Sequence, residues 1–257
     1  MKAAHLALLA SSLLVCALVT PASAQSPFDT PVEAKDFSSP QNFAFEFKLG
    51  PYTPNIDGEF DGGASPYEDL FGDGSGIMIS GEADWQIWRG FGSVGVGLTM
   101  GYFSRSAEPF ADDGNGGPTK SRERVAGETS ITLFPISVLA VYRFDVLAER
   151  WSIPLVPYAK IGLNYTFWWI RKGDGAVASI EGNDANGGSF GWQFNLGIAV
   201  QLDLFEPDAA KSLDANSGIN HSYVFFEMMH LAADGFGSET TLDVGDTTWL
   251  AGLAIEF

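Results

Sequence analysis

The residues best suited to catalysis lie near the end of the chain, where a histidine, a serine and a carboxylate occur close together. His221, Ser222 and Glu227 are the residue types of a serine hydrolase, in which histidine activates the serine hydroxyl. A strand is predicted here, and adjacent strand residues point to opposite faces, so His221 and Ser222 should not converge. His230 has no serine on its own face. We therefore expect no enzyme and no catalytic residues.

An acidic stretch resembles a calcium-binding loop, because such loops carry carboxylates around a glycine at the sixth position. Asp112–Glu123 has Asp, Gly and Glu at the first, sixth and twelfth places of such a loop. The match is poor, since Gly114 and Gly116 stand where ligand side chains are needed. We expect no specific metal site and no cofactor, and at most weak binding of divalent cations spread over acidic loops.

The composition combines strong acidity with many aromatic residues. The chain carries 32 acidic and 14 basic residues, a formal charge of -18, yet 13% of its residues are aromatic. Such acidity argues against nucleic acid as a partner, because nucleic-acid-binding surfaces are basic. It also argues against attachment to anionic lipid through a polybasic patch. The mixture is unusual for a soluble domain, and it is explained if charges and aromatics occupy separate zones.

Residues 1–24 have the organisation of a secretory signal peptide. Lys2 precedes an apolar run over residues 6–19, and Ala22–Ser23–Ala24 supplies the small residues of a cleavage site. The apolar run is too short to be a spanning helix. We therefore expect export and cleavage after residue 24.

A lipoprotein signal ending at Cys16 is the alternative, and the bulky Val15 before it disfavours this interpretation. Because Cys16 is the sole cysteine, the exported chain would hold no disulfide, thiolate nucleophile or cysteine metal ligand. Residues 25–42, rich in Pro and Ser, are expected to be a periplasmic lead-in. Residues 43–257 are expected to form the folded unit.

Beyond this lead-in, apolar residues alternate with small or polar ones, which is the pattern of strands with two different faces. The predicted strands span about 43–49, 77–88, 93–103, 129–144, 155–169, 190–204, 221–231 and 246–257. Pro135 removes one ladder donor, so a bulge or irregular pairing is expected there. Pro207 is expected to begin one or two helical turns. Aromatics near several strand ends fit interfacial belts: Phe43, Tyr52, Tyr102, Trp169, Phe190, Trp192, Trp249 and Phe257.

Charged residues also fall on the less apolar faces of these strands. They are Glu46, Lys48, Glu82, Asp84, Arg143, Lys160, Asp203, Glu227 and Glu256. Buried charges must be paired to be tolerated, so the first interpretation is a network of salt bridges that plugs a lumen. Acids outnumber bases six to three in this set, so some carboxylates are expected to meet water. The second interpretation is a narrow, cation-preferring path, and we favour the plug.

The order of the elements predicts an all-β fold, an eight-stranded antiparallel up-and-down transmembrane β-barrel. Most long connections, rich in Gly and Asp, alternate with shorter ones, and Glu206–Asn220 is the exception. A soluble eight-stranded barrel such as a lipocalin is the alternative. It is disfavoured because so narrow an interior could not hold large apolar side chains from nearly every strand.

The signal peptide, the alternating strands and the terminal Phe257 resemble the small eight-stranded outer-membrane proteins typified by the OmpA transmembrane domain, OmpX and OmpW. The resemblance implies the outer membrane of a Gram-negative cell, Sec export, and contact with outer-membrane lipid, lipopolysaccharide and barrel-assembly machinery. It also implies that the outward face of the last strand is the assembly signal: Trp249, Ala251, Leu253, Ile255 and Phe257. The resemblance extends to the architecture alone, and it assigns a function to no individual residue of this chain beyond the assembly signal.

The expected function is a structural or surface-interaction role through acidic extracellular loops, with the protein as a monomer. The alternative is a narrow, porin-like passive channel or transporter for small or apolar solutes. A lipid-modifying enzyme ranks below both.

Overall fold

The computed structural model describes residues 42–60, 64–111, 124–180, 183–238 and 240–257. The predicted signal peptide, nearly all of the predicted lead-in and the stretch Asp112–Glu123 lie outside these ranges. Within them, no helix is long and apolar enough to cross a bilayer.

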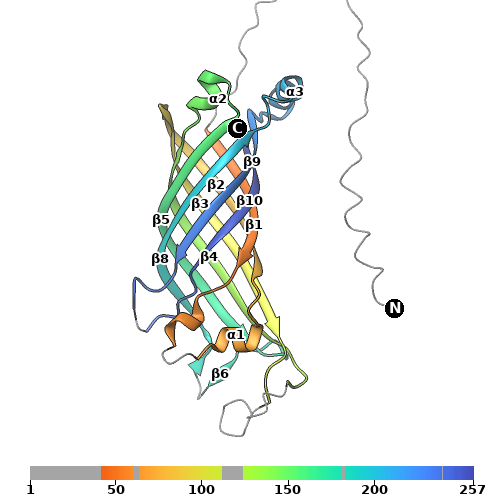
Figure 1. Cartoon of the computed structure of the whole chain (residues 1–257), viewed down its shortest axis with the longest axis vertical. Coiled ribbons are helices and arrows are strands. Elements are labelled where there is room, and N and C mark those ends of the chain that lie inside the picture. Colours follow the sequence, from red (N-terminus) through yellow and green to blue (C-terminus); the bar gives the residue numbers. More distant parts are fainter. Residues whose placement is uncertain (1–41, 61–63, 112–123, 181–182, 239) are drawn as a thin grey trace, which may run out of the picture. The chain divides into compact units, whose positions relative to one another are not determined.

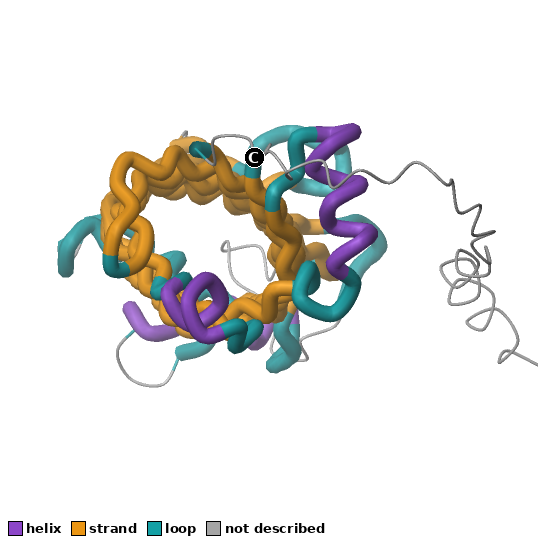
Figure 2. Tube along the Cα trace, turned by 90° about the horizontal axis from the view of Figure 1, so that it is seen from above, coloured by secondary structure: helices purple, strands orange, loops and turns teal. Residues whose placement is uncertain are grey.

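Eight antiparallel strands form one closed barrel, which confirms the predicted fold (Figures 1 and 2). The strands are β1 (Phe43–Tyr52), β2 (Gly76–Gly90), β3 (Gly92–Ala107), β4 (Thr129–Arg143), β5 (Leu155–Arg171), β8 (Asn186–Gln201), β9 (His221–Ala232) and β10 (Asp246–Glu256). Each strand pairs with its neighbours in the chain, and β10 pairs with β1 to close the sheet.

The last residue completes the closure. The Phe257 carbonyl accepts bonds from the amides of Asn42 and Phe43, at 2.7 and 3.1 Å, and its own amide donates to the Phe43 carbonyl at 2.8 Å. Its ring meets that of Phe45 edge to face, with centroids 5.9 Å apart. The terminal aromatic therefore belongs to the seam of the barrel, where backbone groups would otherwise be left unpaired.

Shorter elements lie in the connections. They are η1 (Ile56–Glu59) and α1 (Pro66–Phe71) between β1 and β2, α2 (Val146–Trp151), the β6–β7 hairpin (Ser179–Ile180 and Asn183–Asp184), and α3 (Pro207–Ser217). The structure confirms the helix predicted from Pro207, whereas the other elements were not predicted. Figure 1 places α1 and β6 at one barrel end, the long-loop end, and α2, α3 and Phe257 at the other, the turn end.

The side chains are distributed inside out relative to a soluble barrel. On β1, Phe43, Phe45 and Phe47 are 49%, 48% and 53% exposed, whereas the alternating residues Glu46 and Lys48 are buried. Every strand of the barrel carries exposed large apolar residues on its outer face. The lipocalin-like alternative is therefore excluded, because its apolar face would point inward.

Strand β4 shows the predicted irregularity at Pro135. Pairing between β3 and β4 is interrupted between Met100↔Ile136 and Phe103↔Leu133, and the register is unchanged across the gap. The cause is the missing amide donor of proline. The actual register shift in the barrel was not predicted, and it lies in β2 between Gln86 and Trp88. The predicted facing of the two least regular strands, β4 and β9, is confirmed by their burial patterns.

Candidate functional site

The lumen is crossed at mid-height by a cluster of buried charges. Glu46 on β1 and Glu82 on β2 face each other directly in the strand register, a placement that repels when both are ionised. Lys160 reaches them from β5, and its Nζ lies 2.5 Å from an oxygen of each carboxylate. All three side chains are at most 6% exposed. One ammonium thus compensates two adjacent carboxylates and ties β5 to β1 and β2.

A second ammonium extends this cluster across the lumen. Lys48 Nζ donates to Glu82 Oε2 at 2.7 Å and lies 2.8 Å from Glu227 Oε1, which projects from β9. Arg143 on β4 donates to Glu46 at 2.6 Å and to Asp84. These contacts join β1 and β2 to β4, β5 and β9, so the ion cluster spans the lumen. The ion cluster consists of Glu46, Lys48, Glu82, Asp84, Arg143, Lys160 and Glu227.

Neutral polar side chains continue the ion cluster along the inner wall. Asn195 Nδ2 donates to Glu227 Oε1 at 2.8 Å, and Gln193 Nε2 donates to Asn195 Oδ1 at 2.8 Å. Ser137 then donates to Gln193 at 2.5 Å, and Asn164 donates to Ser137 at 2.8 Å. A chain of paired groups removes the desolvation penalty that unpaired polar groups would carry.

Carboxylate oxygens from Glu46, Glu82 and Asp84 lie within 4.8 Å of one another, a spacing that could hold a metal ion. Five of their six oxygens already face a lysine or arginine nitrogen, and Asp84 Oδ1 is buried without a partner. Because ammonium and guanidinium groups fill the space between these carboxylates, we assign the cluster to side-chain ion pairing.

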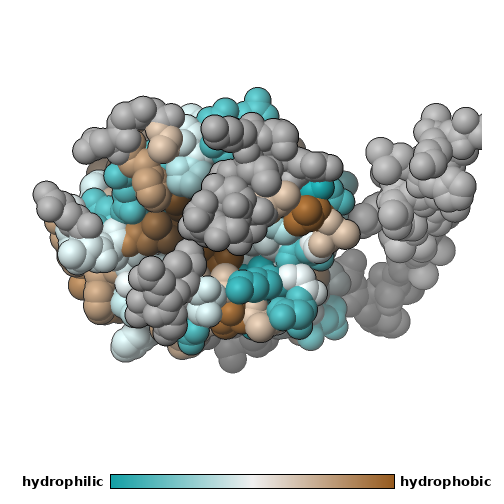
Figure 3. Space-filling view, turned by 90° about the horizontal axis from the view of Figure 1, so that it is seen from below, coloured by the Kyte–Doolittle hydropathy of each residue, from teal (hydrophilic) through white to brown (hydrophobic). Residues whose placement is uncertain are grey.

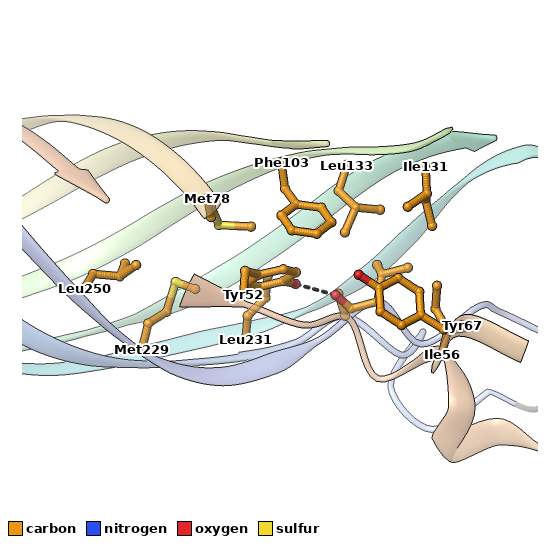
Figure 4. Packing of buried hydrophobic residues seen from close by; sticks show 12 residues of the cluster. Tyr52, Ile56, Tyr67, Met78, Phe103, Ile131, Leu133, Met229, Leu231 and Leu250 are labelled. Carbon is orange, nitrogen blue, oxygen red and sulfur yellow. Dashed lines mark hydrogen bonds between the residues drawn. The ribbon is translucent and has the colours of Figure 1, made fainter. Parts of the chain in front are cut away.

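The long-loop end of the lumen is apolar instead of charged. The apolar plug is the buried cluster of Tyr52, Ile56, Tyr67, Met78, Phe103, Ile131, Leu133, Met229, Leu231, Ala233, Val244 and Leu250 (Figure 4). Tyr52 and Phe103 pack with ring centroids 5.2 Å apart, and the Tyr52 hydroxyl donates to the Val244 carbonyl. Tyr52 was predicted for the lipid belt, and it is fully buried instead.

The connection between β1 and β2 closes over the apolar plug. Ile56 of η1 and Tyr67 of α1 are both buried in it. Asp57 holds the two short helices together, because its carboxylate accepts bonds from the amides of Tyr67 and Glu68 at 2.6 and 2.9 Å. Figure 3 looks onto this end and shows apolar residues exposed between polar ones.

At the turn end, two smaller polar clusters line the rim. Glu256 accepts bonds from Tyr223 at 2.8 Å and from Gln86 at 2.5 Å. Asp203 follows β8 and lies 2.6 Å from His221 Nδ1. Burial opposes ionisation of Asp203, but hydrogen bonds from His221 and Gln201 outweigh it and hold the pKa of this carboxyl below its usual value.

The structure buries eight of the nine predicted charged residues inside the barrel, Glu256 among them close to the rim, and corrects the ninth. Asp203 lies beyond the end of β8, at the rim. The expectation that His221 and Ser222 do not converge is also wrong, because both side chains contact Asp203. Ser222 Oγ lies 3.1 Å from Asp203 Oδ1. Strand alternation does not apply to Asp203, since the chain has already left the sheet there. Ser222 contacts the carboxylate, whereas a hydrolase serine contacts the histidine.

The apolar plug is the part of the site that the sequence interpretation missed. A usable signal exists, because near the long-loop end the inward positions turn apolar, as at Met78, Leu133 and Leu231. The predicted assembly face of β10 points outward as expected, with Trp249 and Leu253 both more than half exposed. Its role in assembly stays a prediction.

No protein-family model and no curated protein matches the chain. Among solved structures, Ail of Yersinia pestis, in complex with the heparin analogue sucrose octasulfate, is 10% identical, with 84% of this chain and 97% of Ail covered and a TM-score of 0.42. Neisserial surface protein A is 13% identical over 84% and 97%, with a TM-score of 0.43. A major outer membrane protein of Thermus thermophilus is 13% identical over 84% and 99%, with a TM-score of 0.40.

The distribution of side chains identifies the barrel as a membrane-spanning one. Large apolar side chains cover its outer wall, and paired charges fill its lumen. A lipid surrounding stabilises such a wall, and closure of the sheet pairs the backbone groups of its edge strands, as lipid requires of a spanning sheet. The chain is a small eight-stranded transmembrane β-barrel protein.

Proposed function

We propose that the protein acts as a closed membrane anchor that presents its long-loop end at the cell surface, and that its loops are the working surface. The observation that carries this proposal is a double obstruction of the lumen. The ion cluster spans the barrel at mid-height, and the apolar plug fills the long-loop end beneath η1 and α1. A solute would have to break buried ion pairs and displace a packed core to pass.

The acidic loops indicate the kind of partner that the surface would accept. A cavity of about 770 Å³ lies between the β1–β2 and β9–β10 connections. Six carboxylates line it: Asp57, Glu68, Asp73, Asp234, Asp243 and Asp246. Among the described residues that line the cavity, none is a lysine or an arginine. Such a surface attracts cations, so partners would be cationic groups or divalent ions that bridge to lipopolysaccharide.

Swelling of proteoliposomes in an isotonic solution of a small neutral sugar tests the closed lumen. We expect swelling no faster than that of protein-free vesicles, because both obstructions are part of the folded barrel. Folded protein is verified in the same sample by its heat-modifiable migration on a gel. Sugar entry at the rate of an open porin would contradict the proposal and favour a passive channel.

A second candidate, uptake of apolar solutes, draws support from the apolar plug alone. An apolar molecule could replace plug residues such as Phe103 and Met229, but the ion cluster lies directly below them. This route would therefore need a lateral exit above the charges.

A closed membrane anchor gives Asp203 and His221 no catalytic role. Expression of the protein should therefore leave the mass of lipid A unchanged.

Deleting Phe257 should impair assembly in cells more than any single loop deletion. The deletion removes both the aromatic terminus, the predicted signal for the assembly machinery, and the bonds to Asn42 and Phe43. Membrane-inserted, heat-modifiable protein is the measurement, and deletion of Asp174–Ala176 in an exposed loop is the control.

The variant Phe257→Ala separates recognition from closure, because it keeps the backbone bonds. We expect it to fold in vesicles without machinery but to assemble poorly in cells. Normal assembly of both variants in cells would show that the terminal aromatic is not the signal.

A further inference from the structure

The loop between β9 and β10 contains the most unusual backbone of the described chain. Gly235, Phe236 and Gly237 follow one another with φ of 68°, 60° and 80°, all in the left-handed region. Glycine adopts this region freely, whereas a residue with a Cβ is strained there. An aromatic residue between two glycines is thus held in a conformation that its own type disfavours.

The strained turn is held by defined bonds. The Phe236 amide donates to Asp234 Oδ1 at 3.0 Å, and the Ser238 amide donates to the Asp234 carbonyl at 3.2 Å. The Gly235 amide donates to the Phe190 carbonyl at 2.8 Å, which ties the turn to the start of β8. Strain of this kind persists where the surrounding structure fixes it, and it often marks a functional position.

The result of this conformation is an aromatic ring turned away from the protein. Phe236 is 62% exposed, and no ring contact involves it among the described residues. Backbone strain and an exposed apolar ring both oppose the observed conformation in water. An apolar or interfacial environment around the ring would offset both the backbone strain and the cost of exposing the ring to water.

The height of the turn on the barrel identifies that surrounding. On the outer face, apolar positions give way to polar ones at His230 and Thr247, which bond to each other at 2.7 Å. Trp192 lies against His230, with ring centroids 5.0 Å apart, and Phe190 next to it is 59% exposed on the lipid side. Aromatic and polar residues mix in this way where hydrocarbon meets headgroups.

The loop leaves the barrel at this boundary. In Figure 1 the β9–β10 connection, in blue, stands out sideways from the wall beside β8. A loop that projects along the barrel axis would meet water, whereas one that projects sideways lies over the lipid next to the barrel.

We propose that the turn Asp234–Ser238 is a lipid-contacting element, in which Phe236 inserts into the interfacial region of the outer leaflet. The ring extends the belt formed by Phe190 and Trp192 beyond the barrel wall. The free energy gained by burying one aromatic side chain is comparable to the strain of one left-handed residue, so insertion offsets the strain. The partner is therefore a lipid surface, and the adjoining carboxylate of Asp234 stays at headgroup level.

Site-directed fluorescence in vesicles tests this directly. In a Cys16→Ser background the chain has no other cysteine, so Phe236→Cys can carry a single environment-sensitive dye. The protein is folded into phosphatidylcholine vesicles with or without nitroxide at the lipid headgroup, and aqueous iodide is the second quencher. Asp174→Cys, in an exposed loop, is the water control, and Leu196→Cys, on the outer face of β8, is the lipid control.

We expect the dye at 236 to be quenched by the lipid nitroxide several-fold more than the dye at 174, and to be protected from iodide. Heat-modifiable migration verifies that each variant is folded. Iodide quenching equal to that at 174, without quenching by the lipid nitroxide, would overturn the proposal and leave the ring in water. Protection from both quenchers would also overturn it, because the ring would then pack against the protein itself.

Discussion

Replacing Lys160 by alanine should lower the free energy of unfolding by about 3–5 kcal/mol, the range seen when one partner of a buried ion pair is removed. The ammonium lies 2.5 Å from both Glu46 and Glu82, which face each other across β1 and β2. Without it, two adjacent buried carboxylates repel each other, and only Lys48 and Arg143 remain to compensate them.

Urea unfolding in lipid vesicles, followed by tryptophan fluorescence, measures this loss. Lys211→Ala on the exposed helix α3 is the matched control and should change the free energy by less than about 0.5 kcal/mol. Combining Lys160→Met with Glu46→Gln and Glu82→Gln removes the charges on both sides, and it should recover most of the stability. A single-variant loss no larger than that of Lys211→Ala would show that the ion cluster does not hold the strands together.

Replacing Phe103 by alanine should lower the free energy of unfolding by about 3–5 kcal/mol, because the change leaves a cavity in a packed core. The ring is fully buried and packs on Tyr52 in the centre of the apolar plug. A Cβ built on Gly76 would overlap this ring, so the ring fills the space to the neighbouring strand.

The same unfolding experiment measures the contribution of the plug, and Phe60→Ala is the control. Phe60 follows η1 in the β1–β2 connection and is 46% exposed, so its loss should change the free energy by less than about 1 kcal/mol. Phe103→Leu keeps most of the volume and should fall between the two. Equal effects of Phe103→Ala and Phe60→Ala would mean that the plug is loosely packed and contributes little.

The barrel itself could be predicted because it follows from patterns within short stretches of sequence. Alternation along β1 separates Phe45 and Phe47 from Glu46 and Lys48, and the same rule assigns the inward carboxylates of β2, β9 and β10. Period-two patterning fixes which face a residue occupies, and the short connections fix the order of strands. Neither depends on contacts between distant residues.

The features that were missed depend on such contacts. Alternation cannot show that Lys160 lies between Glu46 and Glu82, since that requires the stagger of the closed barrel. It also cannot show that the β1–β2 connection folds inward to bury Tyr67. Asp203 was misplaced because the alternating pattern continues two residues past the point where β8 ends.

Single-channel recording in planar bilayers tests the closed lumen most directly, with the natural protein compared with a variant in which both obstructions are reduced. Lys160→Ala combined with Phe103→Ala and Tyr52→Ala removes atoms from the ion cluster and from the apolar plug. The natural barrel should give no steady current steps, and the triple variant, once verified as folded, should give discrete cation-preferring steps. Steady steps from the natural protein itself would contradict a closed barrel.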